Sequence, residues 1–507
     1  MKRRVIVIGE EARRKLSEGA HELAKAVSST LGPYGLNFFL EKKQRPTNDG
    51  AKIASEIQFT DEIKNLGAGA IREAAIKTND EAGDGTTTAI TLAWAIYDAC
   101  SKLLSKEGVM GKMRPADIVR QIEKERLEVE EKLKIMAIPV KTKEQLIASA
   151  RVSVEDEELG KLIGEAQWSV GKEGFLLAEE TAERTSSVER VHGLRIDNGF
   201  GTSVIVNNHE KQTLEVENTK VVLTSYTIKT LSDWQQIMKI CESVGKSGST
   251  QVVIIARAWT DETLKYCLEN INRGAMKIYP LNAPYVDMVQ KMKDLAAVLG
   301  ATFFDSESTV LEDLQISDLG FAEKVVARRF DALITGKNDE RATERIAKRV
   351  EELRQQIHGS QSEFEKKMLL ERIAQLENGF AIVKVGSPSD MERKRLFDKA
   401  EDAVNAVRAA YQEGTVPGAG LAYKEIADSL PDTYILKRPL KSLYEQIMSS
   451  APSDFQVEAW VRDPLKVVRI ALEKACAAAS AFATAGGAIA EEQPKPLDEM
   501  FRKQNTE

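Results

Sequence analysis

Residues that bind transition metals or form redox pairs are scarce in this chain. Its 507 residues include four cysteines and four histidines. Cys100, Cys241, Cys267 and Cys476 lie far apart without a CxxC pair, and the histidines have no paired ligand spacing. We therefore expect free thiols that are buried or partly buried. A zinc or iron site is disfavoured for the same reason.

Long apolar runs are missing as well. No run approaches the roughly 20 residues that a membrane-spanning helix needs. The apolar run that follows the basic N-terminal residues ends at Gly9, too early for a signal-peptide core of about 7–15 residues. The chain is therefore predicted to be cytoplasmic and to have no membrane span.

The charge balance lacks the basic excess of a nucleic-acid-binding protein. The formal net charge is −7, and charges of both signs are mixed along the chain. This pattern argues against nucleic acid as a partner. With 42% hydrophobic and 29% charged residues, the chain is expected to be soluble and globular. Its length suggests about three domains.

The common nucleotide-binding and hydrolase motifs are absent. Gly245-Lys246-Ser247 ends like a P-loop, but the position that requires the first glycine is Ile240. No GxGxxG follows a predicted strand, and no GxSxG elbow is present. A nucleotide site in this chain would need another architecture.

The chain does contain an unusual helix start, in the segment NDEAGDGTTTAITLAWAIYDAC (Asn79–Cys100). Ile90, Trp94 and Tyr97 fall on one side of the predicted helix, and Asp84 precedes three threonines at its beginning. Free N–H groups and hydroxyls there favour a phosphate, which Asp84 would repel unless a cation lay between them. This combination indicates a magnesium-bridged nucleotide. The alternative is that Asp84 caps the helix and the threonines only pack.

Three other segments can contribute to such a site. The segment STLGPYG offers an exposed backbone turn, TNDGA places Asp49 in a turn, and EGTVPGAGLAY (Glu413–Tyr423) is a loop of small residues. Small residues allow a ligand to approach the backbone closely.

The pattern of apolar residues predicts helical regions on both sides of an α/β region. Between Gly193 and Gly379, short β-runs such as TSVIVNN, KVVLTS, QVVIIARA and AMKIYPL alternate with helices. The two glycines are either paired hinges or ordinary turn residues. The helices are predicted over residues 10–31, most of 52–134, 340–358, 362–377, 390–413 and most of 421–485, followed by a polar tail.

Seven segments together resemble a group I chaperonin of the GroEL type. They are STLGPYGLN, NDGAKIASEI, TNDEAGDGTTTA, VGKEG, RQQI, EDAVNAVRAAYQEGTVPGAGLA and DPLKVVRIAL, and they occur in the order found in that family. The resemblance runs from residue 2 to about residue 485. GDGTTTA is the most specific block.

This resemblance implies an α/β multidomain fold with a mainly helical equatorial domain, a small intermediate domain and an α/β apical domain inserted in the chain. The implied boundaries are 1–134 and 413–507 (equatorial, with the polar tail), 135–192 and 380–412 (intermediate), and 193–379 (apical). It also implies self-association into rings around a folding chamber.

The resemblance further implies roles for individual residues. Asp402 matches the carboxylate that positions or activates the attacking water, Asp49 a second acidic residue near it, and Asp84 the Mg²⁺ ligand. ATP, Mg²⁺ and K⁺ are the implied cofactors. The implied nucleotide-binding residues are Thr30, Leu31, Gly32, Pro33, Asp84, Gly85, Thr86, Thr87, Thr88, Gly418, Ala419 and, at the ribose, Asp463.

The chain departs from the family pattern near the nucleotide. Asn48 stands where the family has lysine, and Ala419 replaces the middle glycine of a Gly-Gly-Gly loop. The segment between Ile447 and Asp463 is shorter than in the family and lacks the adenine-contacting Asn-Ala pair. These differences favour a divergent paralogue.

The predicted client-binding face departs too, because Gln235 and Glu269 occupy positions where apolar residues are expected. The implied partners are non-native protein clients and a GroES-type co-chaperonin. The residues predicted to contact them are Phe200, Val204, Ile205, Met238, Leu264, Cys267 and Leu268. Two functions remain open: an ATP-driven folding machine, or a degenerate chaperonin that binds or holds partners with weak or no ATPase activity.

Overall fold

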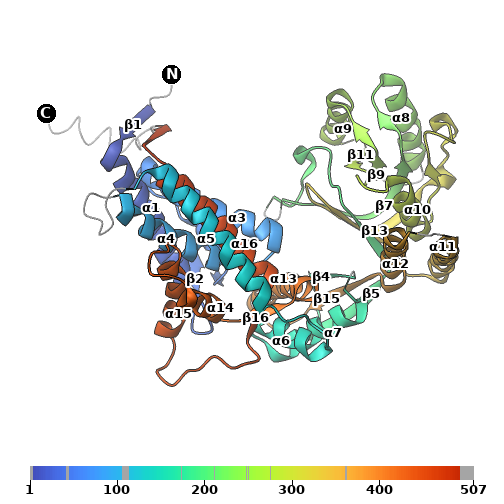
Figure 1. Ribbon diagram of the computed structural model, residues 1–507. Coiled ribbons are helices and arrows are strands. Elements are labelled where there is room, and N and C mark those ends of the chain that lie inside the picture. The colour runs from blue at the N-terminus through green and yellow to red at the C-terminus, as the bar shows by residue number, and fades with distance from the viewer. Residues whose placement is uncertain are drawn as a thin grey trace. The chain divides into compact units, whose positions relative to one another are not determined.

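The structure is a computed structural model that describes residues 4–41, 45–104, 113–172, 174–209, 212–246, 248, 250–274, 276–359 and 362–491 (Figure 1). The tail predicted after Glu491 lies outside these residues. The chain forms two compact units. Unit 1 consists of Met1–Trp168, Ala178–Ser187 and Val383–Glu507, and unit 2 of Ser169–Leu177 and Val188–Ile382.

Unit 1 is mainly helical. Its elements are β1 (Arg4–Ile8), α1 (Gly9–Ser28), β2 (Phe38–Leu40), β3 (Arg45–Thr47), α2 (Gly50–Glu56), α3 (Glu62–Ala82), α4 (Thr86–Leu104), α5 (Pro115–Met136), α6 (Lys143–Val154), α7 (Glu157–Val170), α13 (Asp390–Glu413), β16 (Thr415–Pro417), α14 (Leu421–Ser429), α15 (Lys437–Ser450), β17 (Arg462–Pro464), α16 (Leu465–Ala483) and β18 (Gly487–Glu491).

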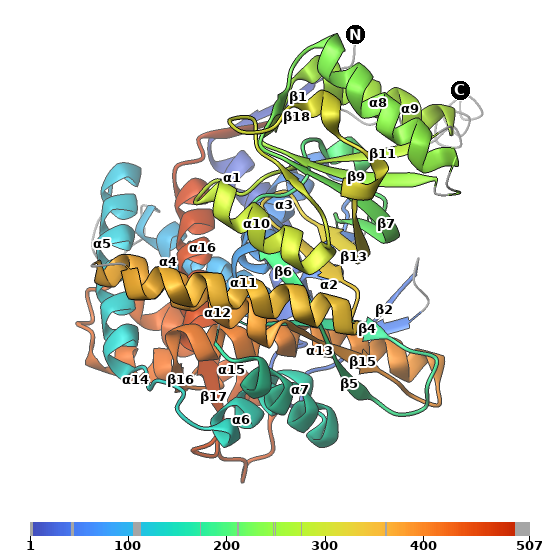
Figure 2. The ribbon, with the colours of Figure 1, turned by 90° about the vertical axis from the view of Figure 1, so that its right-hand side faces the viewer.

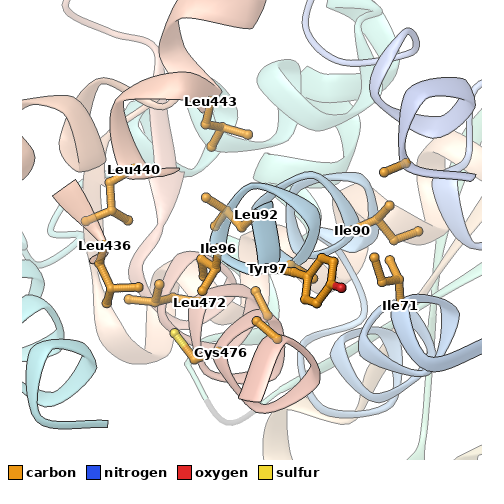
Figure 3. Close-up of a cluster of buried hydrophobic side chains, with 14 of the residues drawn as sticks. Ile71, Ile90, Leu92, Ile96, Tyr97, Leu436, Leu440, Leu443, Leu472 and Cys476 are labelled. Atoms are coloured by element: carbon orange, nitrogen blue, oxygen red, sulfur yellow. The ribbon is translucent and has the colours of Figure 1, made fainter. Parts of the chain in front are cut away.

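Helix α4 lies in the middle of the unit 1 core. Ile90 and Ile96 have no exposed surface, and Tyr97 is 4% exposed. In Figure 3, α4 side chains face Ile71 of α3 and Leu472 of α16. A helix that is apolar on most sides is stable only when neighbours cover it on those sides. The core therefore fixes α4, and with it the threonines at its start.

Two-stranded sheets complete unit 1. The first and last of the described strands, β1 and β18, form an antiparallel pair, and β2 pairs with β3. In the third pair, β16–β17, Val416 lies opposite Asp463. This last pair brings the Gly418–Ala419 loop beside Asp463, although the two segments are far apart in sequence.

Unit 2 is an α/β unit built on a mixed seven-stranded sheet with the order β11-β9-β7-β13-β14-β6, and β12 paired to β7. Its elements are β6 (Gly193–Ile196), β7 (Leu214–Thr224), β8 (Thr227–Ile228), α8 (Leu231–Lys246), β9 (Gln251–Ala256), β10 (Ala258–Trp259), α9 (Asp261–Arg273), β11 (Lys277–Asn282), α10 (Met288–Leu299), β12 (Phe303–Phe304), β13 (Gly320–Ala327), β14 (Ala332–Gly336), α11 (Glu340–Gly359) and α12 (Glu363–Asn378), with 3₁₀ turns at Ser203–Ile205, Leu311–Asp313 and Ile316–Asp318.

Helices cover both faces of this sheet. Since successive strand residues point to opposite sides, one strand contributes side chains to two cores. Val252 and Ile254 of β9 join the core under α8, whereas Val253 and Ile255 join the core under α10. Figure 2 shows α8 next to α9, and the rings of Trp234 and Tyr266 lie 5.7 Å apart between them. The boundary between the units crosses β4 (Phe175–Glu180) and β15 (Phe380–Val385), which form a sheet with β5 (Ser187–Val191).

The expected α/β multidomain class is confirmed, and two local predictions are corrected. The segment TSVIVNN was expected to be a β-run, but Ser203–Ile205 is a 3₁₀ turn that begins at the Thr202 side chain. Helix α1 ends at Ser28 rather than near residue 31. All four cysteines are free and buried, as expected. No helix in the described part of the chain is long and apolar enough to cross a membrane.

Candidate nucleotide site

The start of α4 leaves backbone donors for a ligand. Gly83 and Gly85 both have a left-handed backbone, with φ of 71° and 82°, so the chain turns sharply around Asp84. The Ala89 amide donates to the Gly85 carbonyl at 3.0 Å. The amides of Thr86–Thr88 precede it and therefore have no acceptor within the helix. Together with the helix dipole they favour an anion.

The start of α2 packs directly against these threonines. Asp49 caps α2, accepting hydrogen bonds from the amides of Ala51 at 2.9 Å and Lys52 at 3.2 Å. A Cβ at Gly50 would lie 3.0 Å from the Thr87 Cα and would clash with its hydroxyl. Glycine is therefore required for this close approach, which holds Asp49 beside the start of α4.

Helix α13 carries Asp402 to the same place. One turn beyond Asp402, the Asn405 side-chain amide donates to the Gly83 carbonyl at 3.2 Å. Burial, and then repulsion by the Asp84 and Asp49 carboxylates, raises the pKa of Asp402 well above its usual range. The predicted catalytic pair and the predicted metal ligand thus share one electrostatic environment.

Two further carboxyl groups of this site also have raised pKa values. Burial raises the pKa of Asp84 to about 6, with repulsion from Asp49 adding to it and a 2.6 Å hydrogen bond from the Gly85 amide opposing it. Burial and repulsion by Asp84 raise the pKa of Asp463 to about 7. Asp49, Asp84, Asp402 and Asp463 therefore form one acidic cluster, which a cation would stabilise.

The donor set suits Mg²⁺ better than a metal held by protein ligands alone. No group of three or more His, Cys, Asp or Glu side chains within the described ranges is arranged to hold a metal ion. Mg²⁺ usually binds through one or two carboxylates and completes its shell with phosphate oxygens and water. A half-buried Asp84 next to amides that have no acceptor within their own helix fits that mode of binding.

The Gly418–Ala419 loop contacts the site through Asp463. A Cβ at Gly418 would lie 2.9 Å from an Asp463 carboxylate oxygen, and the Ala419 amide donates to that carboxylate. Ala419 adopts φ of 54°, a left-handed conformation. Such a residue costs about 1–2 kcal/mol relative to glycine. The loop thus keeps the backbone geometry of a glycine despite the substitution.

The Thr30–Pro33 turn lies beside α15. Gly32 has φ of 78°, and a Cβ there would lie 3.0 Å from Ile447. The Thr30 hydroxyl donates to the Val27 carbonyl at 2.8 Å, Leu31 is half-buried, and Pro33 is exposed. A nucleotide contact by this turn stays a prediction.

Two charged residues of the site, Lys52 and Asp398, were not predicted from the sequence. The Lys52 ammonium lies 3.2 Å from an Asp49 oxygen and 2.9 Å from an Asp398 oxygen. Their spacing was the available signal, because Lys52 follows Asp49 by three residues and Asp398 precedes Asp402 by four. Residues at these helical spacings share a face.

In unit 2, the predicted client-binding residues separate into two groups. Phe200, Ile205 and Cys267 are 8%, 5% and 0% exposed, because their side chains enter the two cores of the unit. This burial corrects the expectation that they form part of a surface. Val204 is exposed, and Met238, Leu264 and Leu268 are half-buried. These four stay a prediction.

The two predicted hinge glycines lie on adjoining segments. A Cβ at Gly193 would clash with the Phe380 ring, and a Cβ at Gly379 would lie 2.5 Å from the Val191 carbonyl oxygen. Gly379 ends α12 with φ of 58° and ψ of −141°, a conformation that glycine adopts and other residues adopt only with strain. The structure thus brings the two crossings together, and a hinge motion stays a prediction.

Comparison with known proteins identifies the family. The model of the TCP-1/cpn60 chaperonin family matches residues 23–434. The chain therefore belongs to this chaperonin family, which confirms the resemblance drawn from its motifs.

Solved structures share the fold. The chain is similar to two crystal structures of chaperonin gp146 from bacteriophage EL 2 (Pseudomonas aeruginosa), both in the presence of ATP-BeFx. The first has a TM-score of 0.67 at 20% identity and covers 97% of this chain and 100% of gp146. The second has a TM-score of 0.60 at 20% identity, with 96% and 98% covered.

Proposed function

We propose that this chaperonin binds non-native proteins and assists their folding in a ring chamber, driven by ATP binding and hydrolysis. The observation that carries this proposal is the acidic cluster at the start of α4. Burial and nearby carboxylates raise the pKa values of Asp84, Asp402 and Asp463, so a cation would stabilise their charged forms. The neighbouring amides favour an anion. A magnesium-bound triphosphate supplies both.

The roles of the residues follow from their positions. Asp84 would hold Mg²⁺, which would offset the negative charge of the phosphates. Gly85 and Thr86–Thr88 would bind phosphate oxygens through amides and hydroxyls. Asp402, with Asp49 near it, would orient the attacking water and accept its proton. A raised pKa suits such a base, because it brings proton affinity closer to neutral pH.

The proposal also assigns the units. Unit 2 contains the whole apical domain expected over 193–379 and a few flanking residues of the expected intermediate domain. Unit 1 combines the expected equatorial domain with the rest of the intermediate domain. Gly193 and Gly379 would act as the hinge. Val204, Met238, Leu264 and Leu268 would contribute to client or co-chaperonin binding.

Replacement of Asp402 by alanine tests the ATPase cycle. We expect turnover of magnesium-ATP to fall about 10²- to 10⁴-fold, as when a general base is removed, while nucleotide still binds. Steady-state phosphate release and calorimetry measure the two properties. Asp390→Asn, at an exposed carboxylate at the start of the same helix, is the matched control and should leave both unchanged. Intact turnover in Asp402→Ala would contradict the role proposed for Asp402 in hydrolysis.

The second candidate function is a degenerate chaperonin that binds or holds partners without a productive cycle. Exposed Gln235 and Glu269 on α8 and α9 favour it, because they make the expected client face more polar. Calorimetry of the wild type with magnesium-ATP separates the two functions. Tight binding contradicts the degenerate protein, and absence of binding contradicts the folding machine.

A further inference from the structure

Lys52 is surrounded by carboxylates from two helices. Its ammonium pairs with Asp49, the cap of its own helix α2, at 3.2 Å and with Asp398 of α13 at 2.9 Å. The Asp402 carboxylate is close enough to attract it as well. The side chain of Lys52 is 22% exposed, and those of Asp49 and Asp398 are 20% and 17% exposed. This is a half-buried ionic cluster rather than a surface pair.

The geometry of α13 connects this cluster to the reaction. Asp398 and Asp402 are one helical turn apart and therefore share a face. An ion pair from α2 to Asp398 consequently fixes the turn that carries Asp402. Next to it, Lys399 pairs with Glu155, which follows α6, at 2.6 Å, so this turn of α13 is held from two sides.

The charge of the cluster also requires a cation. Asp49, Asp398 and Asp402 place three carboxylates next to a site proposed for a triphosphate, and like charges at this burial repel strongly. Burial of Lys52 opposes its charged form, but attraction by Asp49 and Asp398 outweighs burial and raises its pKa. Lys52 therefore stays protonated over the whole range in which the protein would work.

We propose that the Lys52 ammonium is a built-in monovalent cation of the nucleotide site, which neutralises Asp49 and Asp398 and thereby positions Asp402 for hydrolysis. This inference rests on the proposed ATPase function. Lys52 is a positioning residue, because it acts through the carboxylates. Without it, a dissolved monovalent cation would have to occupy the same place.

The test compares the wild type with Lys52→Met in potassium chloride and in choline chloride at equal ionic strength. In choline, we expect the variant to lose about 10- to 100-fold in kcat with a smaller change in KM, since positioning is lost rather than binding. Potassium should restore much of this loss in the variant and change the wild-type rate little. Lys52→Arg, which keeps the charge, should retain most of the rate in choline. Calorimetry of magnesium-ATP binding follows both variants independently of turnover.

The outcomes separate the two proposals. Wild-type turnover with an equally active Lys52→Met in choline would overturn the role of Lys52 alone, as would a folded, inactive variant that potassium does not restore. A wild type without turnover would overturn the proposed function, and the role of Lys52 with it. If Lys52→Met does not fold, Lys52→Gln, which also lacks the charge, takes its place in the same comparison.

Discussion

At the scale of single residues, the ionised form of Asp84 destabilises the folded protein when no ligand is bound, and a bound cation would remove this destabilisation. The pKa of Asp84 is raised to about 6. Between about pH 4 and about pH 6, the folded protein therefore keeps this carboxyl group protonated, whereas the unfolded chain has lost the proton. A carboxyl group with a raised pKa makes the folded protein less stable as the pH rises from about 4 to about 7. Above that window the full cost is present.

Asp84→Asn is therefore expected to stabilise the nucleotide-free protein at about pH 8. The gain should be about 1–2 kcal/mol, which discounts the shift for the partial exposure of the site. The asparagine oxygen can still accept the hydrogen bond that the Gly85 amide donates. Urea unfolding at about pH 5 and about pH 8 without magnesium measures it, and the advantage should shrink at the lower pH.

Asp390→Asn is the control, because its carboxylate is 84% exposed. It should change stability little at either pH. A variant Asp84→Asn that is no more stable than the wild type at the higher pH would contradict the electrostatic description of the site.

Residue by residue, the sequence predicted the site in part. The DGTTT segment shows its chemistry through the residue types at a helix start, and the structure brings Asp49, Asp402 and Asp463 to it. The spacing of Lys52 from Asp49 and of Asp398 from Asp402 was a signal for their place near the site. Their pairing with each other could not be predicted, because it depends on how α2 meets α13 in space. The burial of Phe200 and Cys267 was likewise hidden, because an apolar residue on an amphipathic helix or strand suits a core and a binding surface equally well.

At the scale of elements, prediction followed local periodicity. Helix α13 has the bounds expected from the sequence. Helix α12 begins as expected just after Ser362, whose side chain accepts a hydrogen bond from the Glu365 amide. The β1–β18 pair was missed, since nothing local in either strand identifies a partner at the other end of the chain. The failed strand at Ser203–Ile205 shows the converse: β-branched residues favour a strand only where another strand pairs with them.

The connection after α12 gives a prediction at this scale. Gly379→Ala places a side chain at φ of 58° and 2.5 Å from the Val191 carbonyl oxygen. Such strain and overlap should cost about 2 kcal/mol or more and lower the urea midpoint. The control is Gly69→Ala within α3, where a Cβ would meet nothing within 4 Å. It should gain about 0.5–1 kcal/mol from helix propensity. Equal midpoints for the two variants would contradict the strained connection.

At the scale of the whole molecule, exposed apolar strand residues in unit 1 favour the proposed self-association. Phe39 on β2 is 77% exposed, and Ile6, Ile8 and Ile489 on the β1–β18 pair are 66%, 74% and 58% exposed. Apolar side chains on two-stranded sheets with open edges are suited to pairing with another copy.

Phe39→Glu should therefore lower the particle mass in sedimentation velocity, because a charge on this strand would be costly to bury between subunits. Phe330→Glu, at a phenylalanine of unit 2 that is 74% exposed, is the matched control and should leave the mass unchanged. An unchanged mass for Phe39→Glu, from a wild type that does assemble, would exclude β2 from the interface.

The most direct test of the account is a structure of the protein determined with Mg²⁺ and a non-hydrolysable ATP analogue. We predict that the phosphates lie against the Thr86–Thr88 amides, with the metal between them and Asp84 and with Asp402 facing the terminal phosphate. A nucleotide bound elsewhere, or no nucleotide at a saturating concentration, would contradict the account.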